Sequence, residues 1–200
     1  MDGEHYFSAR PVSDERRRSL HVVLQGEPFE LQTAAGTFSP ERLDAGTAVL
    51  LNRVPPPASS GALLDLGCGW GPIAIAMARR SPEAEVWAVD VNERARTLAA
   101  ENARIAGVQI RTSSPEDIPA TLRFATIWSN PPVRIGKAAL HELLEAWLPR
   151  LAPGGSAWLV IAKHLGGDSL QSWLQERFPE FEVRRAATDR GYRVLTCRRR

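Results

Sequence analysis

The chain is poor in cysteine and lysine, and it lacks long apolar runs. Its 200 residues include two cysteines, Cys68 and Cys197, which are too few for a disulfide framework or a cysteine-based metal cluster. No hydrophobic stretch approaches the length that crosses a bilayer, and the N-terminal residues are acidic and polar rather than typical of a signal peptide. We therefore expect one globular domain over residues 1–200, located in the reducing cytoplasm, with no metal and no membrane partner.

The basic residues are nearly all arginine. Of the 25 lysines and arginines only Lys137 and Lys163 are lysine, and the net charge is +2. The segment 184–200 holds seven arginines against one acid, Asp189. Because arginine forms bidentate contacts with phosphate, this segment is either a face for nucleic acid or a solvated arginine-rich surface.

An apolar run that ends in a glycine loop lies near residue 65. Leu63–Leu66, which includes Asp65, is followed by the glycine-rich loop Gly67–Gly71 and by an apolar segment from Pro72 onward. A buried strand that breaks at glycines and continues as a helix is typical of a nucleotide-cofactor turn, because the backbone there can approach a ligand and offers free N–H groups. The nicotinamide fingerprint needs a glycine where Pro72 stands, so a dehydrogenase is disfavoured.

Strand-like and helix-like segments alternate along the chain. Two β-rich runs, 21–25 and 29–33, predict an N-terminal hairpin around Gly26-Glu27-Pro28, and Ser39-Pro40 predicts the start of a helix. Further strands are expected at 62–66, 85–89, 108–112, 124–129, 156–162, 181–187 and 191–197, and helices at 72–80, 92–106, 137–151 and 168–178.

This alternation predicts the fold class. We expect an α/β protein with a doubly wound, mainly parallel, seven-stranded sheet of the Rossmann-like type. The last two strands are joined too closely for a crossover, so they should form an antiparallel hairpin. Residues 1–40 would be a small extension that carries the N-terminal hairpin, and residues 41–200 the cofactor-binding catalytic core.

Two acids lie at the ends of the first two predicted parallel strands. Asp90 ends the second of them, where a carboxylate can accept hydrogen bonds from two ribose hydroxyls. The alternative is an acid favoured by the dipole of the next helix, for which Asn92 is the expected N-cap. Asp65 either helps to hold the amino-acid end of a cofactor or ties down the turn.

The motif Ser129-Asn130-Pro131-Pro132 ends the fourth strand of that sheet. The Asn130 side-chain oxygen and the Pro131 carbonyl can together accept both hydrogens of an –NH2 group. Such bonds aim the nitrogen lone pair and stabilise the positive charge that develops as the nitrogen attacks. The alternative is an ordinary Asn-Pro turn.

These motifs together resemble class I S-adenosylmethionine-dependent methyltransferases that act on an exocyclic or amide nitrogen. More narrowly, the chain resembles the small-domain family, which includes the ribosomal small-subunit RNA guanine-N2 methyltransferases, over residues 5–195. The motifs that carry this resemblance are His5–Ser8, Gly36–Ser39, Leu43–Thr47, Leu64–Gly71, Val89–Asn92 with Arg94-Ala95, and Ser129–Pro132 with Gly136-Lys137.

The resemblance implies S-adenosyl-L-methionine as cofactor and assigns roles to residues. Asn130 and Pro131 would orient the target amine and serve as the catalytic residues. The expected cofactor-binding residues are Thr47, Asp65, Gly67, Cys68, Gly69, Gly71, Asp90, Val91, Glu116 and Asn130. The expected substrate-binding residues are Pro132, Val133, Arg134 and Lys137. Arg134 and Lys137 flank a helix start, which suits a phosphate, although surface ion pairs are an equal alternative.

Two positions depart from the family pattern. Val133 stands where many relatives have an aromatic residue that stacks on the target base, so another aromatic side chain would have to serve; Tyr6, Phe7, Trp70 and Trp128 are the candidates, with Trp128 expected in the core. Ser114 stands where an acid usually contacts the adenine, and Glu116 or Asp117 would replace it.

The predicted activity is methylation of a guanine exocyclic amine in ribosomal RNA, with RNA or the small ribosomal subunit as partner. The charge on the sulfonium already activates the leaving group, so no metal is needed. One alternative is the same chemistry on adenine N6 or a protein glutamine amide. Another is a cofactor- or RNA-binding scaffold without catalysis.

Overall fold

A computed structural model of the chain describes residues 16–132 and 136–200. The strands are Arg17–Leu24 (β1), Glu27–Ala34 (β2), Ala62–Leu66 (β3), Glu85–Val89 (β4), Arg111–Ser113 (β5), Phe124–Ser129 (β6), Leu151–Ala162 (β7), Phe181–Asp189 (β8) and Tyr192–Arg199 (β9). The α-helices are Ala45–Arg53 (α1), Pro72–Arg80 (α2), Glu93–Ile105 (α3), Lys137–Trp147 (α4) and Gly167–Arg177 (α5), and 3-10 turns lie at Pro115–Asp117, Leu148–Arg150 and Lys163–Leu165.

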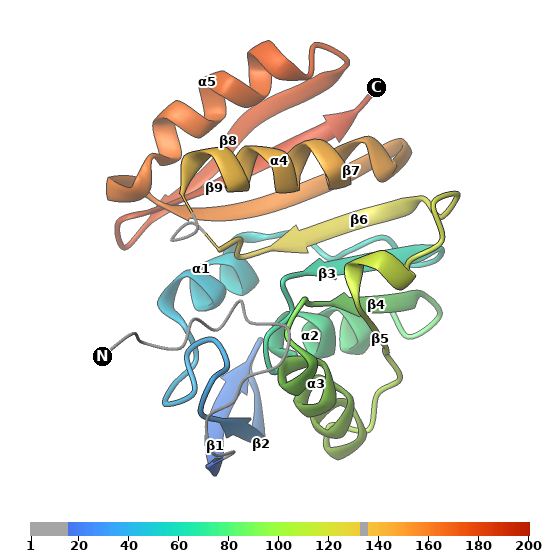
Figure 1. Cartoon of the computed structure of the whole chain (residues 1–200), viewed down its shortest axis with the longest axis vertical. Helices are drawn as coiled ribbons and strands as arrows, with labels where there is room; N and C mark the ends of the chain where they lie inside the picture. The colour runs from blue at the N-terminus through green and yellow to red at the C-terminus, as the bar shows by residue number, and fades with distance from the viewer. Residues whose placement is uncertain (1–15, 133–135) are drawn as a thin grey trace.

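The main sheet has seven strands in the order β5-β4-β3-β6-β7-β9-β8, and β1 pairs with β2 in a separate hairpin (Figure 1). β3 to β7 run parallel, while β9 is antiparallel to both β7 and β8. The predicted doubly wound sheet with a C-terminal antiparallel hairpin is therefore confirmed. Its order reverses at β3, where β4 and β5 extend the sheet to one side and β6 extends it to the other.

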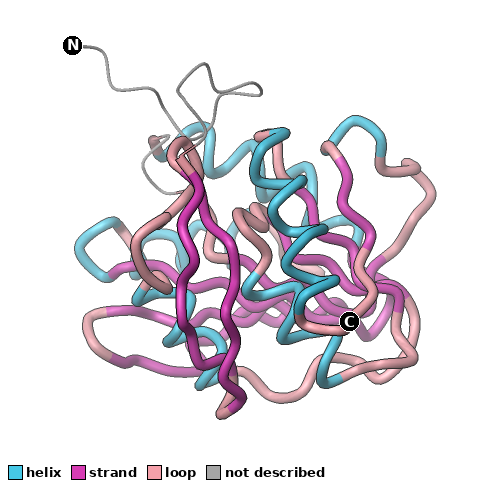
Figure 2. Tube along the Cα trace, turned by 90° about the horizontal axis from the view of Figure 1, so that it is seen from below, coloured by secondary structure: helices cyan, strands magenta, loops and turns pink. Residues whose placement is uncertain are grey.

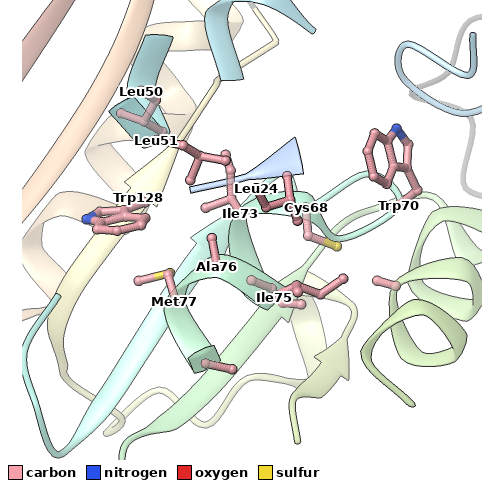
Figure 3. Packing of buried hydrophobic residues seen from close by; sticks show 14 of the residues in the cluster. Leu24, Leu50, Leu51, Cys68, Trp70, Ile73, Ile75, Ala76, Met77 and Trp128 are labelled. Atoms are coloured by element: carbon pink, nitrogen blue, oxygen red, sulfur yellow. The ribbon is translucent and has the colours of Figure 1, made fainter. Parts of the chain in front are cut away.

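Two hydrophobic clusters cover the two faces of the sheet. Successive side chains of a strand point to opposite faces, so Leu63 belongs to the cluster beneath α1, α2 and α3, and Leu64 to the cluster beneath α4 and α5. Figure 3 shows the first cluster, in which Ile73 and Met77 of α2 lie among apolar side chains of neighbouring elements. Strands buried on both faces explain the continuous apolar runs in the sequence.

The N-terminal hairpin is attached to the first of these clusters. Leu24 and Leu31 are buried in it, and Figure 2 shows the hairpin standing against the rest of the chain. Asn102 of α3 fastens β2: its Oδ1 accepts from the Gln32 N–H (2.7 Å), and its Nδ2 donates to the carbonyls of Gln32 and Trp70 (both 2.8 Å). The same amide thus links the hairpin to the glycine loop.

Several predicted boundaries are wrong. The turn of the first hairpin is Gln25-Gly26, both with positive φ (53° and 92°), so the second strand starts at Glu27 rather than after Pro28. The strand expected at 108–112 is Arg111–Ser113, and the one expected at 156–162 begins at Leu151. The helix expected to reach residue 151 ends at Trp147, because a 3-10 turn follows it.

The helix predicted with Ser39 as N-cap and Pro40 as first residue begins five residues later, at Ala45. Asp44 is its N-cap, and the Oδ1 of Asp44 accepts from the N–H groups of Gly46 (2.8 Å) and Thr47 (3.1 Å). Ser39 has a φ of 48°, a left-handed conformation, and lies in the loop before the helix. Within the residues described, no helix is both long and apolar enough to span a membrane.

Candidate active site at the carboxyl edge of the sheet

A cavity lies at the carboxyl ends of β3, β4 and β6. This cavity has a volume of about 420 Å³, within the range of small-molecule sites, and it lies where the strand order reverses, the usual ligand position in such sheets. It is lined by Phe38, Leu66, Gly67, Val89, Asp90, Val91, Pro115, Asn130, Pro132, Ala139, Glu142 and Leu143. A smaller cavity of about 20 Å³ shares Phe38, Gly67 and Asn130 with it and extends to Asp44, Thr47 and Gly69.

Backbone of the glycine loop lines both cavities: Gly67 lines the large one, and Gly67 and Gly69 line the small one. The N–H groups of Gly67 and Cys68 donate to the Val89 carbonyl (2.8 and 3.0 Å), which holds the loop against β4. Gly71 has a φ of 95° and caps α2, and a Cβ there would lie 3.1 Å from the Cα of Ala99. Gly71 therefore shapes the loop and lets α3 approach, while Gly67 is exposed to the cavities.

Asp90 lies between the glycine loop and the start of α3. Its Oδ2 accepts from the Gly69 N–H and its Oδ1 from the Asn92 N–H, both at 2.9 Å. The carboxylate lines the large cavity, and each oxygen keeps a second lone pair for a further donor. Burial raises the pKa of Asp90, although the hydrogen bonds from Asn92 and Gly69 and the charge of Arg96 oppose that rise.

Asp65 is fully buried beneath the loop and lines neither cavity. Its Oδ2 accepts from the Ala74 N–H in the first turn of α2 (2.9 Å), so this acid ties the end of β3 to the helix. Its Oδ1 is buried without a hydrogen-bond partner. Burial raises the pKa of Asp65 well above its ordinary value, and the nearby charge of Asp90 raises it further.

The Cys68 thiol is buried as well. Burial, followed by the charges of Asp90 and Asp65, raises the pKa of Cys68 well above its ordinary value. A protonated, enclosed thiol is a poor nucleophile, so Cys68 acts here as a small apolar side chain.

Asn130 follows β6 and lines both cavities. Its Nδ2 donates to the Asp44 Oδ1 (2.7 Å) and to the Thr47 Oγ1 (3.0 Å). The strand end that carries it is fixed, because the Ser129 hydroxyl donates to the Leu66 carbonyl at the end of β3 (2.7 Å). The structure thus brings Gly67, Gly69, Asp90 and Asn130 to a single crevice.

Two residues of this crevice had no assigned role from the sequence. Asp44 contacts Asn130, and Phe38 lines both cavities. The loop that carries Phe38 is held against α3, where Asn92 Nδ2 donates to the Gly36 carbonyl (2.7 Å) and an Arg94 guanidinium nitrogen to the Ala35 carbonyl (2.6 Å). The only sequence signal was that both residues fall within motifs shared with the small-domain family.

The other expected site residues are placed as follows. Val91 and Pro132 line the large cavity, Thr47 lines the small one, and Pro131 is buried next to Asn130. Lys137 is exposed at the start of α4. Val133 and Arg134 lie outside the described residues, as do Tyr6 and Phe7.

The residues expected to contact the adenine and to stack on the target base lie mostly away from the large cavity. Glu116 is exposed and lines neither cavity, whereas its neighbour Pro115 does. The Ser114 hydroxyl donates to the Asp117 carboxylate (2.6 Å). Trp128 is in the core as expected. Trp70 borders the small cavity but is only 2% exposed, so little of its ring is accessible to an entering base.

Much of the C-terminal arginine cluster is engaged within the protein. Arg185 and Arg193 both pair with Asp168 (2.9 and 3.0 Å), and Arg199 donates to the carbonyls of Pro149 and Leu151. These contacts favour a structural surface for that part of the segment.

Comparison with known proteins places the chain in a methyltransferase family. The family of the methyltransferase small domain matches residues 28–196. The uncharacterized protein YbxB of Bacillus subtilis is 32% identical over 98% of this chain and 98% of its own length. The ribosomal RNA small subunit methyltransferase C of Pseudomonas syringae pv. syringae is 32% identical over 93% of this chain. The chain spans about half of that relative's length (56%).

Solved structures share the fold. A T. thermophilus 16S rRNA N2 methyltransferase, in complex with AdoMet and guanosine, has a TM-score of 0.79 and 24% identity; the match covers 95% of this chain and 52% of the other. A methyltransferase from Pyrococcus furiosus has a TM-score of 0.62 and 21% identity over 80% of this chain and 86% of the other.

Proposed function

The chain belongs to the methyltransferase small-domain family, and on that premise we propose that it methylates the exocyclic N2 amine of a guanine in small-subunit ribosomal RNA. Its cofactor is S-adenosyl-L-methionine. The observation that carries the proposal is the placement of the Asn130 amide. Its nitrogen donates hydrogen bonds to Asp44 and Thr47, and the side chain lines the large cavity. The guanine assignment is supported by relatives named as small-subunit rRNA methyltransferases and by the neighbour solved with guanosine.

The residues present fit the cofactor. Asp90 has lone pairs left for two ribose hydroxyls, and the exposed Gly67 leaves room for the methionine part beside Thr47. The apolar side chains of Val91 and Leu143 line the large cavity and suit a flat adenine ring. When bound, the cofactor supplies a methyl group that the positive charge on sulfur has already activated.

The protein itself contributes positioning and electrostatics. Asn130 Oδ1 and the Pro131 carbonyl would each accept one hydrogen of the guanine amine, which draws the nitrogen lone pair out of conjugation with the ring and aims it. As the nitrogen gains positive charge, these two oxygens stabilise it, and the surplus proton leaves to solvent. Phe38 lines both cavities and would limit the access of water to the reacting atoms.

Transfer of a tritiated methyl group tests the proposal. The purified protein is incubated in parallel with naked ribosomal RNA, small ribosomal subunits and a protein extract, and labelled nucleosides are then identified. We expect label in RNA as N2-methylguanosine, incorporated more than about tenfold more slowly by Asn130→Ala. Label in N6-methyladenosine or in a glutamine amide would contradict the guanine assignment, and RNA binding without label would favour a scaffold.

A further inference from the structure

Both amide hydrogens of Asn130 are used inside the protein. One bond goes to Asp44 Oδ1 (2.7 Å) and the other to Thr47 Oγ1 (3.0 Å). A carboxylate can only accept hydrogen bonds, so a rotated amide would place the Asn130 oxygen against the Asp44 oxygen with no hydrogen between them. The contact with Asp44 therefore favours one of the two amide orientations, the one that leaves Oδ1 for the crevice.

Asp44 is itself held in place. The same Oδ1 accepts from the N–H groups of Gly46 (2.8 Å) and Thr47 (3.1 Å) as the cap of α1. The absence of a side chain at residue 46 makes room for this arrangement, because a Cβ there would lie 3.0 Å from the Asp44 oxygen and 3.4 Å from the Asn130 nitrogen. One carboxylate oxygen thus joins the start of α1 to the end of β6.

We propose that Asp44 is a positioning residue for methyl transfer, which locks the Asn130 amide so that its oxygen faces the acceptor. The site then selects acceptor groups that donate hydrogen bonds, such as an –NH2 group, and disfavours carbonyl or ether oxygens. The carboxylate also polarises the Asn130 amide, which strengthens Oδ1 as an acceptor when positive charge develops on the nitrogen. The acceptor chemistry rests on the proposed function, whereas the locked amide does not.

Two variants separate the parts of this role. Asp44→Ser keeps a good N-cap but removes the carboxylate that reaches Asn130, and Asp44→Asn keeps an oxygen in place without the charge. Loss of one charge-assisted hydrogen bond corresponds to a fall in kcat of about 10- to 100-fold for Asp44→Ser, and Asp44→Asn should recover part of it. Asp44 also borders the small cavity, so the affinity for S-adenosylmethionine should fall as well, but by clearly less than kcat, because the bond to Asn130 acts on the acceptor.

The matched control is Arg53→Ala, at the other end of α1. It removes the ion pair with Asp189 (3.0 Å) and perturbs the same helix away from Asn130, so kcat should not change. A fall in kcat equal to that of Asp44→Ser would mean that any disturbance of α1 is sufficient. A loss of cofactor affinity in Asp44→Ser equal to its loss of kcat would make Asp44 a cofactor ligand. Either result would overturn the proposal.

A second readout needs no acceptor. The side-chain amide signal of Asn130 in a ¹⁵N–¹H spectrum is identified by its absence in Asn130→Ser. Its hydrogens should exchange slowly with water in the wild type and faster in Asp44→Ser. Equal exchange rates would overturn the lock. If the rates differ as expected but wild-type protein methylates no RNA, the proposed function fails and the orientation by Asp44 stands.

Discussion

Replacing Asp90 with alanine should weaken cofactor binding far more than it disturbs the fold. Each oxygen of this carboxylate already accepts one backbone N–H, from Gly69 and from Asn92. What remains on the cavity side is one lone pair per oxygen, the number needed for the two hydroxyls of a ribose. The variant removes both acceptors at once and leaves the surrounding strands β3 and β4 paired.

The expected size of the effect follows from this geometry. A hydrogen bond to a charged group contributes about 1.5–3 kcal/mol, so loss of two such bonds corresponds to about 10²- to 10⁴-fold in affinity. Asp90→Asn should fall between wild type and alanine. It keeps one acceptor oxygen, but its –NH2 group faces a backbone N–H from Gly69 or Asn92 and so breaks one loop bond.

Titration calorimetry with S-adenosylmethionine measures these affinities directly. Asp189→Asn is the control, because Asp189 is an acid that lines neither cavity and pairs with Arg53. Circular dichroism establishes that each variant is folded. An Asp90→Ala protein that is folded and binds the cofactor within about threefold of wild type would refute the assignment of Asp90 to the ribose.

Three further expectations concern other residues. Asn130→Ala should lower kcat by more than about tenfold and leave cofactor affinity nearly unchanged, as single-turnover kinetics and calorimetry would show; equal losses in both would contradict the separate roles of Asn130 and Asp90. Gly71→Ala should cost about 3 kcal/mol of unfolding free energy in denaturant titrations, since its φ is 95° and a Cβ would lie 3.1 Å from Ala99; a cost below about 1 kcal/mol would speak against that strain. Burial raises the pKa of Asp65, so the folded protein binds that proton more tightly than the unfolded chain, and wild-type stability falls as pH rises from about 4 to the raised pKa. The unfolding free energy of Asp65→Asn minus that of wild type should therefore increase across that pH window. A difference that does not change with pH would contradict the raised pKa of Asp65.

The strand, glycine loop and helix around residue 67 could be predicted because their determinants are local. The apolar run of β3, the positive φ values of the loop glycines and Pro72 at the start of α2 all act within a few residues. The Asn92 cap is a similar case, since its Oδ1 accepts from the Ala95 N–H as expected (3.2 Å). Asp90 and Asn130 each follow a parallel strand, and the carboxyl ends of parallel strands meet at one edge of a sheet, so their placement at that edge could be predicted as well.

The start of α1 could not be predicted in this way. Ser39-Pro40 and Asp44 are both good local start signals, and the choice between them depends on a contact made elsewhere in the chain. Asp44 also accepts from Asn130, 86 positions away, and no sequence pattern reports that pair. Phe38 was missed for the same reason, because its loop is held over the crevice by bonds from Asn92 and Arg94 to backbone carbonyls.

A crystal structure of the protein with S-adenosylhomocysteine and guanosine would show directly whether Asp90 and Asn130 hold cofactor and acceptor in one crevice. We expect ribose hydroxyls on the Asp90 carboxylate and the guanosine exocyclic nitrogen on Asn130 Oδ1. That nitrogen should lie about 3–3.5 Å from the place where a transferable methyl carbon would be. A cofactor bound away from Asp90, or an Asn130 oxygen turned away from the guanosine, would contradict this arrangement.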